Sequence, residues 1–205
     1  MAPARAASVL TCLALLATSS WANPIDVPLE VRRIVEAASV EVLPARCGGV
    51  LVAPRLVLTA LHCVRSGDVP LRVRFGGGPP RAVRVAHVDD DADQAALVLE
   101  DPAGADPLAV ARRLPIVGSV LFFAGNPDHP RWQSARLDGI GRCPSLPDLP
   151  NALFTSLRGL PGDSGSPLVD GAGRVVGLVH GGARCQIATP GDHLARLRDA
   201  ALSGG

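Results

Sequence analysis

A serine in a glycine-rich turn is the first residue of this 205-residue sequence whose surroundings suit chemistry. Ser164 lies in the stretch Gly-Leu-Pro-Gly-Asp-Ser-Gly-Ser-Pro, which covers residues 159–167. The glycines would let a carbonyl group approach the backbone closely, and the N–H groups of Gly162 and Ser164 could converge where an oxyanion would form. A serine hydroxyl is a weak nucleophile, so this hypothesis requires a base and a carboxylate elsewhere in the chain.

The candidate base is His62, which follows an apolar run predicted to be a strand ending near Thr59. Cys63 comes next, and a disulfide there would hold the turn that carries the histidine. Taken alone, a histidine in this position is more often structural or at the surface. The interpretation of His62 as a base therefore depends on the residues predicted to lie near it.

The candidate carboxylate is Asp93, which directly precedes the apolar strand predicted over residues 95–99. A buried carboxylate bonded to the base would fix its tautomer and stabilise the imidazolium. Asp89, Asp90 and Asp91 are alternatives in the same acidic run, although such runs commonly form solvated turns. Asp93 is preferred because it lies against the strand.

Composition indicates a globular protein and argues against two classes of partner. Hydrophobic residues make up 47% and charged residues 19% of the chain, which favours a packed core over disorder. The net charge of +1 gives no electrostatic basis for binding nucleic acid or an anionic membrane. We therefore expect neither partner.

The first 22 residues are predicted to form a secretory signal peptide. Arg5 supplies a positive charge, the apolar run 9–17 is too short to span a bilayer, and Ala22 ends a small-x-small cleavage site. An uncleaved anchor is one alternative. A lipoprotein anchored through Cys12 is another, but the small residue normally found before that cysteine is absent. We expect a secreted or periplasmic protein with no membrane contact after cleavage.

Removal of the signal would leave an even number of cysteines, namely Cys47, Cys63, Cys143 and Cys185. In an exported chain this number suggests two disulfides, for which three pairings are possible. A zinc site is the alternative, but it is disfavoured because no Cys-x-x-Cys pair occurs.

The remaining pattern predicts many short strands separated by glycine and proline turns, which is typical of an all-β barrel or sandwich. Only the C-terminal end is predicted to be helical, with Leu194, Leu197 and Ala201 on one face and Asp192 as its cap. The expected strands cover residues 39–43, 49–52, 56–59, 71–75, 81–85, 95–99, 119–124, 134–140, 153–156, 167–169 and 174–179.

Three motifs together resemble the chymotrypsin/trypsin-like serine peptidases, in particular the compact secreted members from bacteria. They are the segment from Cys47 to Cys63 that ends in Leu-Thr-Ala-Leu-His-Cys, then Asp93-Gln-Ala, then Gly-Asp-Ser-Gly-Ser-Pro ending at Pro167. Their order of His, Asp and Ser is the order found in that family. The resemblance covers roughly residues 37–204.

The resemblance implies two six-stranded antiparallel β-barrels with the site between them, and a C-terminal helix. We place an N-terminal segment at 23–36, the first barrel at 37–104, a connection at 105–118, and the second barrel with the helix at 119–205. The Cys47–Cys63 pairing is favoured by the family motif, which leaves Cys143 to pair with Cys185.

The resemblance also implies roles for the candidate residues. His62 would be general base and then acid, Asp93 would orient it, and Ser164 would attack the carbonyl group. The N–H groups of Gly162 and Ser164 would form the oxyanion hole. Gly181 and Gly182 would lie where the family binds substrate backbone as an added strand.

Two departures from the family pattern lead to further expectations. Activated members of the family pair a new N-terminus, made by cleavage, with the Asp before the nucleophile, which is Asp163 here. Arg33-Ile-Val resembles such a cleavage site, but it lies too close to Cys47 for the new N-terminus to reach Asp163, and no Gly pair follows it. We expect an internal arginine to pair with Asp163 instead, with Arg131 as the first candidate.

Substrate preference is indicated only by two basic residues. Arg158 lies near the expected floor of the specificity pocket, and His180 could line its wall, which would favour an acidic side chain before the cleaved bond. Alternatively, Arg158 is a solvated loop residue, and Ser156 and His180 support the triad.

The sequence therefore predicts a monomeric serine endopeptidase that acts on proteins or peptides without a metal or an organic cofactor. Two other functions stay open. One is a catalytically latent protease fold used for binding, and the other is an esterase.

Overall fold

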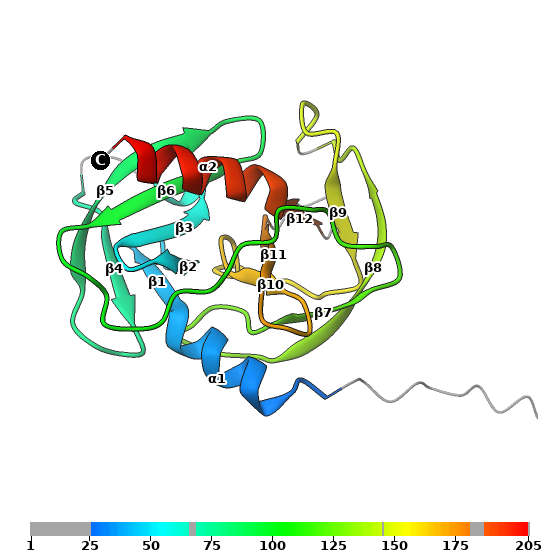
Figure 1. The fold of residues 1–205 in the computed structure, drawn as a ribbon, viewed down its shortest axis with the longest axis horizontal. Helices are drawn as coiled ribbons and strands as arrows, with labels where there is room; N and C mark the ends of the chain where they lie inside the picture. The colour runs from blue at the N-terminus through cyan, green and yellow to red at the C-terminus, as the bar shows by residue number, and fades with distance from the viewer. Residues whose placement is uncertain (1–25, 66–68, 145, 181–186, 205) are drawn as a thin grey trace, which may run out of the picture.

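The structure, a computed structural model, describes residues 26–65, 69–144, 146–180 and 187–204. Its strands form two closed antiparallel barrels that lie side by side (Figure 1). The first barrel has the strand order β1-β2-β3-β6-β5-β4, and the second has the order β10-β11-β12-β9-β8-β7. This architecture confirms the predicted fold.

The first barrel consists of β1 (Ser39–Leu43), β2 (Cys47–Ala53), β3 (Leu56–Ala60), β4 (Arg72–Phe75), β5 (Arg81–Asp89) and β6 (Gln94–Leu99). The second consists of β7 (Val120–Phe123), β8 (Gln133–Gly141), β9 (Ala152–Thr155), β10 (Pro167–Val169), β11 (Val175–Val179) and β12 (Ile187–Pro190). The sequence pattern anticipated each of these strands except β12. A run of four residues that ends in proline carries too weak a strand signal.

In the described part of the chain, two α-helices flank the barrels, α1 (Leu29–Ala38) and α2 (Gly191–Ser203). The prediction that only the C-terminal end is helical is wrong, because α1 forms and buries Val31, Val35 and Ala38 on one face. The predicted cap of α2 is also wrong, because Pro190 is the N-cap and Asp192 lies in the first turn. The predicted apolar face of α2 is confirmed, since Leu194, Leu197 and Ala201 are buried there.

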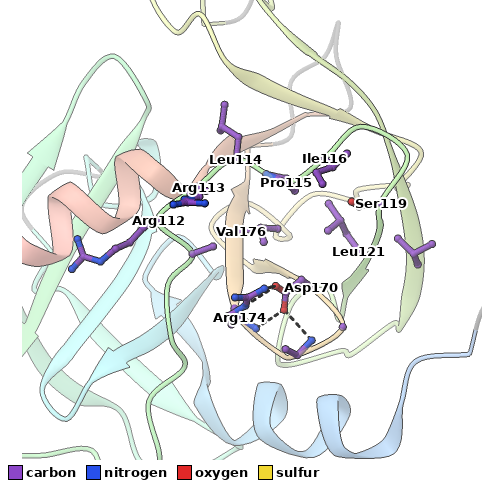
Figure 2. A pocket seen from close by; sticks show the side chains of 14 residues that line it. Arg112, Arg113, Leu114, Pro115, Ile116, Ser119, Leu121, Asp170, Arg174 and Val176 are labelled. Carbon is purple, nitrogen blue, oxygen red and sulfur yellow. Dashed lines mark hydrogen bonds and ion pairs between the residues drawn. The ribbon is translucent and has the colours of Figure 1, made fainter.

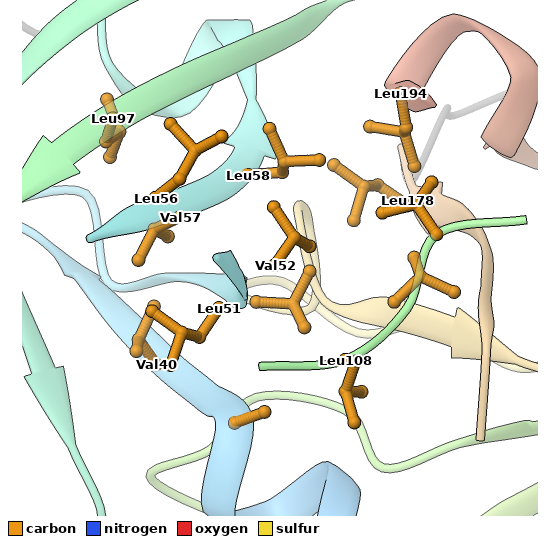
Figure 3. Close-up of a cluster of buried hydrophobic side chains, with 14 of the residues drawn as sticks. Val40, Leu51, Val52, Leu56, Val57, Leu58, Leu97, Leu108, Leu178 and Leu194 are labelled. Carbon is orange, nitrogen blue, oxygen red and sulfur yellow. The ribbon is translucent and has the colours of Figure 1, made fainter. Parts of the chain in front are cut away.

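A continuous apolar core joins the two barrels. Leu51, Leu56 and Leu58 of the first barrel belong to the same buried cluster as Leu178 of β11 and Leu194 of α2 (Figure 3). Helix α2 starts at the end of β12 and runs back across the first barrel (Figure 1). The barrels are therefore held together by buried hydrophobic surface, which is the largest favourable contribution to most packed interfaces.

Among the described residues, no helix is both long and apolar enough to cross a membrane. The predicted signal peptide, residues 1–22, lies outside the described residues.

Candidate active site

Strand pairing in the first barrel brings His62 and Asp93 together. Strands β3 and β6 pair in a register that sets Ala60 opposite Gln94. His62 lies just beyond the end of β3, in the short 3-10 helix Leu61–Cys63, and Asp93 lies just before the start of β6. Two residues that follow and precede paired strand ends must be neighbours, although they are far apart in sequence.

The Asp93 carboxylate makes two contacts with His62. Its Oδ2 atom lies 2.6 Å from the His62 Nδ1 atom, and its Oδ1 atom accepts a hydrogen bond of 3.0 Å from the His62 backbone N–H. The Asp93 side chain is 10% exposed and that of His62 is 42% exposed. The carboxylate is thus enclosed behind a ring whose other edge faces solvent.

The pKa of Asp93 is set by opposing effects. Burial raises the pKa, but hydrogen bonds from His180 and His62, together with the charges of those rings, outweigh burial and lower the pKa to about 2. Asp93 is therefore ionised at neutral pH and accepts hydrogen bonds from both histidines. It also has φ of 51°, a left-handed conformation that aspartate adopts more readily than most residues.

Contacts in the second barrel and across the barrel interface position Ser164. Just before β10, Gly165 N–H donates to the Val179 carbonyl at 2.7 Å, which sets the serine beside the end of β11. Across the interface, Gly48 N–H donates to the Ser164 carbonyl at 2.8 Å. Gly165 has φ of 79°, and a Cβ atom there would lie 2.3 Å from the Gly48 carbonyl oxygen, so the site requires glycine.

The Ser164 hydroxyl donates a hydrogen bond of 3.0 Å to the carbonyl oxygen of His180, the residue that follows β11. No hydrogen bond joins it to His62 within the described part of the chain. Ser164 nevertheless lies beside the turn that carries His62, because its carbonyl oxygen is 3.9 Å from the Sγ atom of Cys63, the residue after His62. Rotation of the serine side chain would redirect its hydroxyl.

His180 provides a third polar contact to Asp93. Its Nδ1 atom lies 2.7 Å from the Asp93 Oδ2 atom, the same oxygen that contacts His62. Its side chain is 13% exposed. Of the two roles predicted for His180, these contacts favour support of the triad over lining of a substrate pocket.

The turn before Ser164 leaves two backbone donors available. Gly162 has φ of 92°, in the region that favours glycine. Among the described residues, neither Gly162 N–H nor Ser164 N–H has a hydrogen-bond acceptor. Asn126 holds this turn in place, because its side-chain amide donates to the Gly162 carbonyl at 3.0 Å and to the Arg46 carbonyl at 2.7 Å.

The prediction that Arg131 pairs with Asp163 is confirmed. Arg131 Nη2 donates to Asp163 Oδ2 at 2.6 Å, and the Asp163 side chain is only 3% exposed. The backbone N–H groups of Leu160 and Asn126 also donate to this carboxylate, at 2.6 Å and 2.9 Å. The buried charge before Ser164 is therefore fully paired from within the chain.

The predicted pairing of Cys47 with Cys63 is confirmed, with Cα atoms 6.1 Å apart. Cys143 is also disulfide-bonded. Its predicted partner, Cys185, lies outside the described residues, and so do Gly181 and Gly182.

Arg158 lies at the surface, and its backbone N–H and carbonyl groups pair with the side-chain amide of Gln133 at 3.1 Å each. A cavity of about 820 Å³ lies elsewhere, at the second barrel, and none of the predicted site residues lines it (Figure 2). Two arginines that line it are already paired, Arg174 with Asp170 and Arg112 with Asp199.

Among the residues that the structure describes, two sets of side chains have the composition of a metal site. The first contains Cys47 and Cys63, which are joined to each other as a disulfide. The second contains His62, Asp93 and His180, but its N···O contacts of 2.6 Å and 2.7 Å are hydrogen bonds. Two such ligands of one zinc ion would be separated by about 3.3 Å. The arrangement suits proton transfer better than metal binding.

Sequence reasoning assigned no role to two residues near the site. Gln94 is fully buried and donates to the Thr189 hydroxyl of β12 at 2.8 Å, which links the barrels. An amide at the start of an otherwise apolar strand was the signal for such a buried contact. Asn126 gave a weaker signal, since its Gly-Asn-Pro context indicates only a turn.

Comparisons with known proteins agree with this fold. A family model described as a trypsin-like peptidase domain matches residues 47–178. Among solved structures, the inactive form of the Rv3671c protease is similar with 23% identity and a TM-score of 0.66, over 82% of this chain and 91% of that chain. The inactive form of a serine-to-alanine mutant of Rv3671c from M. tuberculosis H37Rv has 22% identity and a TM-score of 0.68, over 86% and 92%. A comparison with curated proteins gave no match.

Proposed function

Because this chain belongs to the trypsin-like peptidase family, we propose that it is a serine endopeptidase that cleaves proteins or peptides through an acyl-enzyme. The observation that carries the proposal is the contact of 2.6 Å between His62 Nδ1 and Asp93 Oδ2, beside a serine in a turn with two unpaired N–H donors. In this family the same three residue types perform nucleophilic catalysis.

The proposed reaction begins when the Ser164 hydroxyl turns from the His180 carbonyl toward the His62 Nε2 atom. His62 then takes the hydroxyl proton as the serine oxygen attacks the scissile carbonyl group. Asp93 stays ionised and stabilises the imidazolium, while Gly162 N–H and Ser164 N–H donate to the oxyanion. His62 returns the proton to the leaving amine, and water hydrolyses the acyl-enzyme by the same steps.

The ion pair between Arg131 and Asp163 supports an enzyme that needs no N-terminal cleavage for activation. In zymogens of the family, a new N-terminus supplies the positive charge for this aspartate. Here an internal guanidinium already occupies that position, and Arg33 and Ile34 lie inside helix α1. We propose that the second barrel adopts its active arrangement on folding.

We also propose that the protein acts outside the cytoplasm, secreted or periplasmic, as a monomer. The Cys47–Cys63 disulfide supports this location, because such bonds persist mainly in oxidising compartments.

Labelling with a fluorophosphonate probe tests the proposal. The protein without residues 1–22 should form a covalent adduct at Ser164, and Ser164→Ala and His62→Ala variants should not. Cleavage of a randomised peptide library, compared with simple acyl esters, then separates an endopeptidase from an esterase. Absence of labelling in the folded wild type would support a latent binding protein in which the hydroxyl stays on the His180 carbonyl.

A further inference from the structure

Two imidazole rings meet on a single carboxylate oxygen in this site. The Nδ1 atoms of His62 and His180 lie 2.6 Å and 2.7 Å from Asp93 Oδ2, and the ring planes are 89° apart. One ring comes from the end of β3 in the first barrel and the other from the end of β11 in the second. The proposed mechanism uses only the first ring.

Both rings must carry a proton on Nδ1. An ionised carboxylate can only accept hydrogen bonds, so each ring is the donor in its contact with Asp93. When neutral, each ring therefore has a bare Nε2 atom. For His62 this is the tautomer that a general base needs.

His180 also restricts the position of Asp93. One carboxylate oxygen is shared by the two rings, and the other accepts the His62 backbone N–H at 3.0 Å. Rotation of the carboxylate about its Cβ–Cγ bond would break contacts with both barrels at once. The Ser164 hydroxyl bonds to the backbone carbonyl of the same residue, so His180 touches both the acid and the nucleophile.

We infer that His180 is a positioning residue that acts through Asp93, and that His62 and His180 share a single proton whose positive charge the Asp93 carboxylate balances. This inference rests on the proposed function. In the described part of the chain, the ionisable side chains that face His180 are Asp93 and His62. A single carboxylate balances one imidazolium, and a second positive charge 5.4 Å away is repelled. A proton on His180 therefore opposes proton transfer to His62.

Substitution by asparagine separates the two parts of this inference. The side-chain nitrogen of asparagine lies the same number of bonds from the backbone as Nδ1 of histidine, so His180→Asn keeps a donor for Asp93 but cannot titrate. His180→Ala removes both properties. We expect kcat of His180→Ala to fall about 10- to 100-fold, the effect of losing a hydrogen bond to a charged group, with KM changed less than about twofold.

His180→Asn should recover most of the lost kcat, and the acid limb of its kcat/KM profile should move to lower pH. If the rings bind the shared proton equally, the statistical shift is about 0.3 pH unit. His193→Asn is the matched control. His193 lies on helix α2, and its Nδ1 atom is 2.8 Å from the Oδ2 atom of Asp89 in a comparable pair. That variant should retain the wild-type kcat and acid limb.

A second measurement does not require activity. Imidazole NMR of the Ser164→Ala protein should show two downfield Nδ1–H resonances on Asp93, one lost in His180→Asn and the other in His62→Asn. The two rings should titrate as a coupled pair. Independent titration, or an unchanged kcat in His180→Ala, would overturn the inference. Failure of the proposed function would instead appear as absent fluorophosphonate labelling with the NMR pattern intact.

Discussion

Removal of the Arg131 guanidinium is expected to affect stability and catalysis together. Asp163 is 3% exposed and accepts hydrogen bonds from Arg131 and from two backbone N–H groups. Loss of one partner from a buried ion pair typically costs about 3–5 kcal/mol. The Arg131 side chain is 37% exposed, so water can replace part of the contact. We therefore expect Arg131→Gln to lower the free energy of unfolding by about 2–3 kcal/mol.

Catalysis should fall as well, because Asp163 lies between the two residues whose N–H groups are proposed to bind the oxyanion. An uncompensated charge at Asp163 would draw the turn toward solvent and misalign those donors. Loss of one oxyanion donor typically reduces kcat about 10²- to 10³-fold, so misalignment of the two N–H donors should reduce kcat about 10²-fold. Urea unfolding measures the first effect, and steady-state cleavage of a peptide measures the second.

The control is Arg136→Gln, which removes an exposed pair with Asp138 in the same barrel. That change should cost less than about 0.5 kcal/mol and leave kcat intact. The double variant Arg131→Gln/Asp163→Asn should be more stable than Arg131→Gln alone, because it leaves no unpaired charge. Equal effects of Arg131→Gln and Arg136→Gln would refute the argument that the buried charge requires its partner.

Three further predictions concern the site and its supports. Since the folded pKa of Asp93 is about 2, below the unfolded value of about 3.9, its stabilisation should be complete above about pH 4 and lost as the pH falls through 2. Urea unfolding of the Ser164→Ala protein and of the Ser164→Ala/Asp93→Asn protein, from pH 6 to 2, measures this effect. The difference between their free energies of unfolding should narrow in acid. The double change Cys47→Ala/Cys63→Ala should cost about 3 kcal/mol in unfolding free energy, measured the same way. Gly165→Ala, which forces a Cβ within 2.3 Å of a carbonyl oxygen, should abolish probe labelling and lower the thermal midpoint.

Local patterns in the sequence were sufficient to predict most of the fold. Alternation of arginine with apolar residues in 72–75 predicted β4, in which Arg72 is exposed and Val73 is buried. Helix α1 was missed although its buried residues, Val31, Val35 and Ala38, have helical spacing. The helix has ten residues and no side-chain N-cap, so the chain lacks the start signal that usually marks a helix there.

The site was harder to predict than the fold, because its contacts join segments with no sequence relationship. His62, Asp93 and Ser164 could be selected because each lies in a local sequence suited to its role. The contact of His180 with Asp93 depends on how the second barrel docks on the first, and Gln94 shows the same dependence. No local signal distinguishes a histidine that lines a pocket from one that supports a carboxylate.

The position of Asp93 at the barrel interface explains why the site needs both barrels. The first barrel supplies the carboxylate and one imidazole through the pairing of β3 with β6, and the second supplies the other imidazole at the end of β11. Hydrogen bonds of 2.6 Å and 2.7 Å tolerate displacements of only a few tenths of an ångström. Such accuracy requires rigid docking, and the shared core provides it through Leu178 and Leu194, which pack with the leucines of the first barrel. The apolar interface therefore determines the geometry of the polar site, and substitutions that loosen this core should reduce catalysis before they unfold the protein.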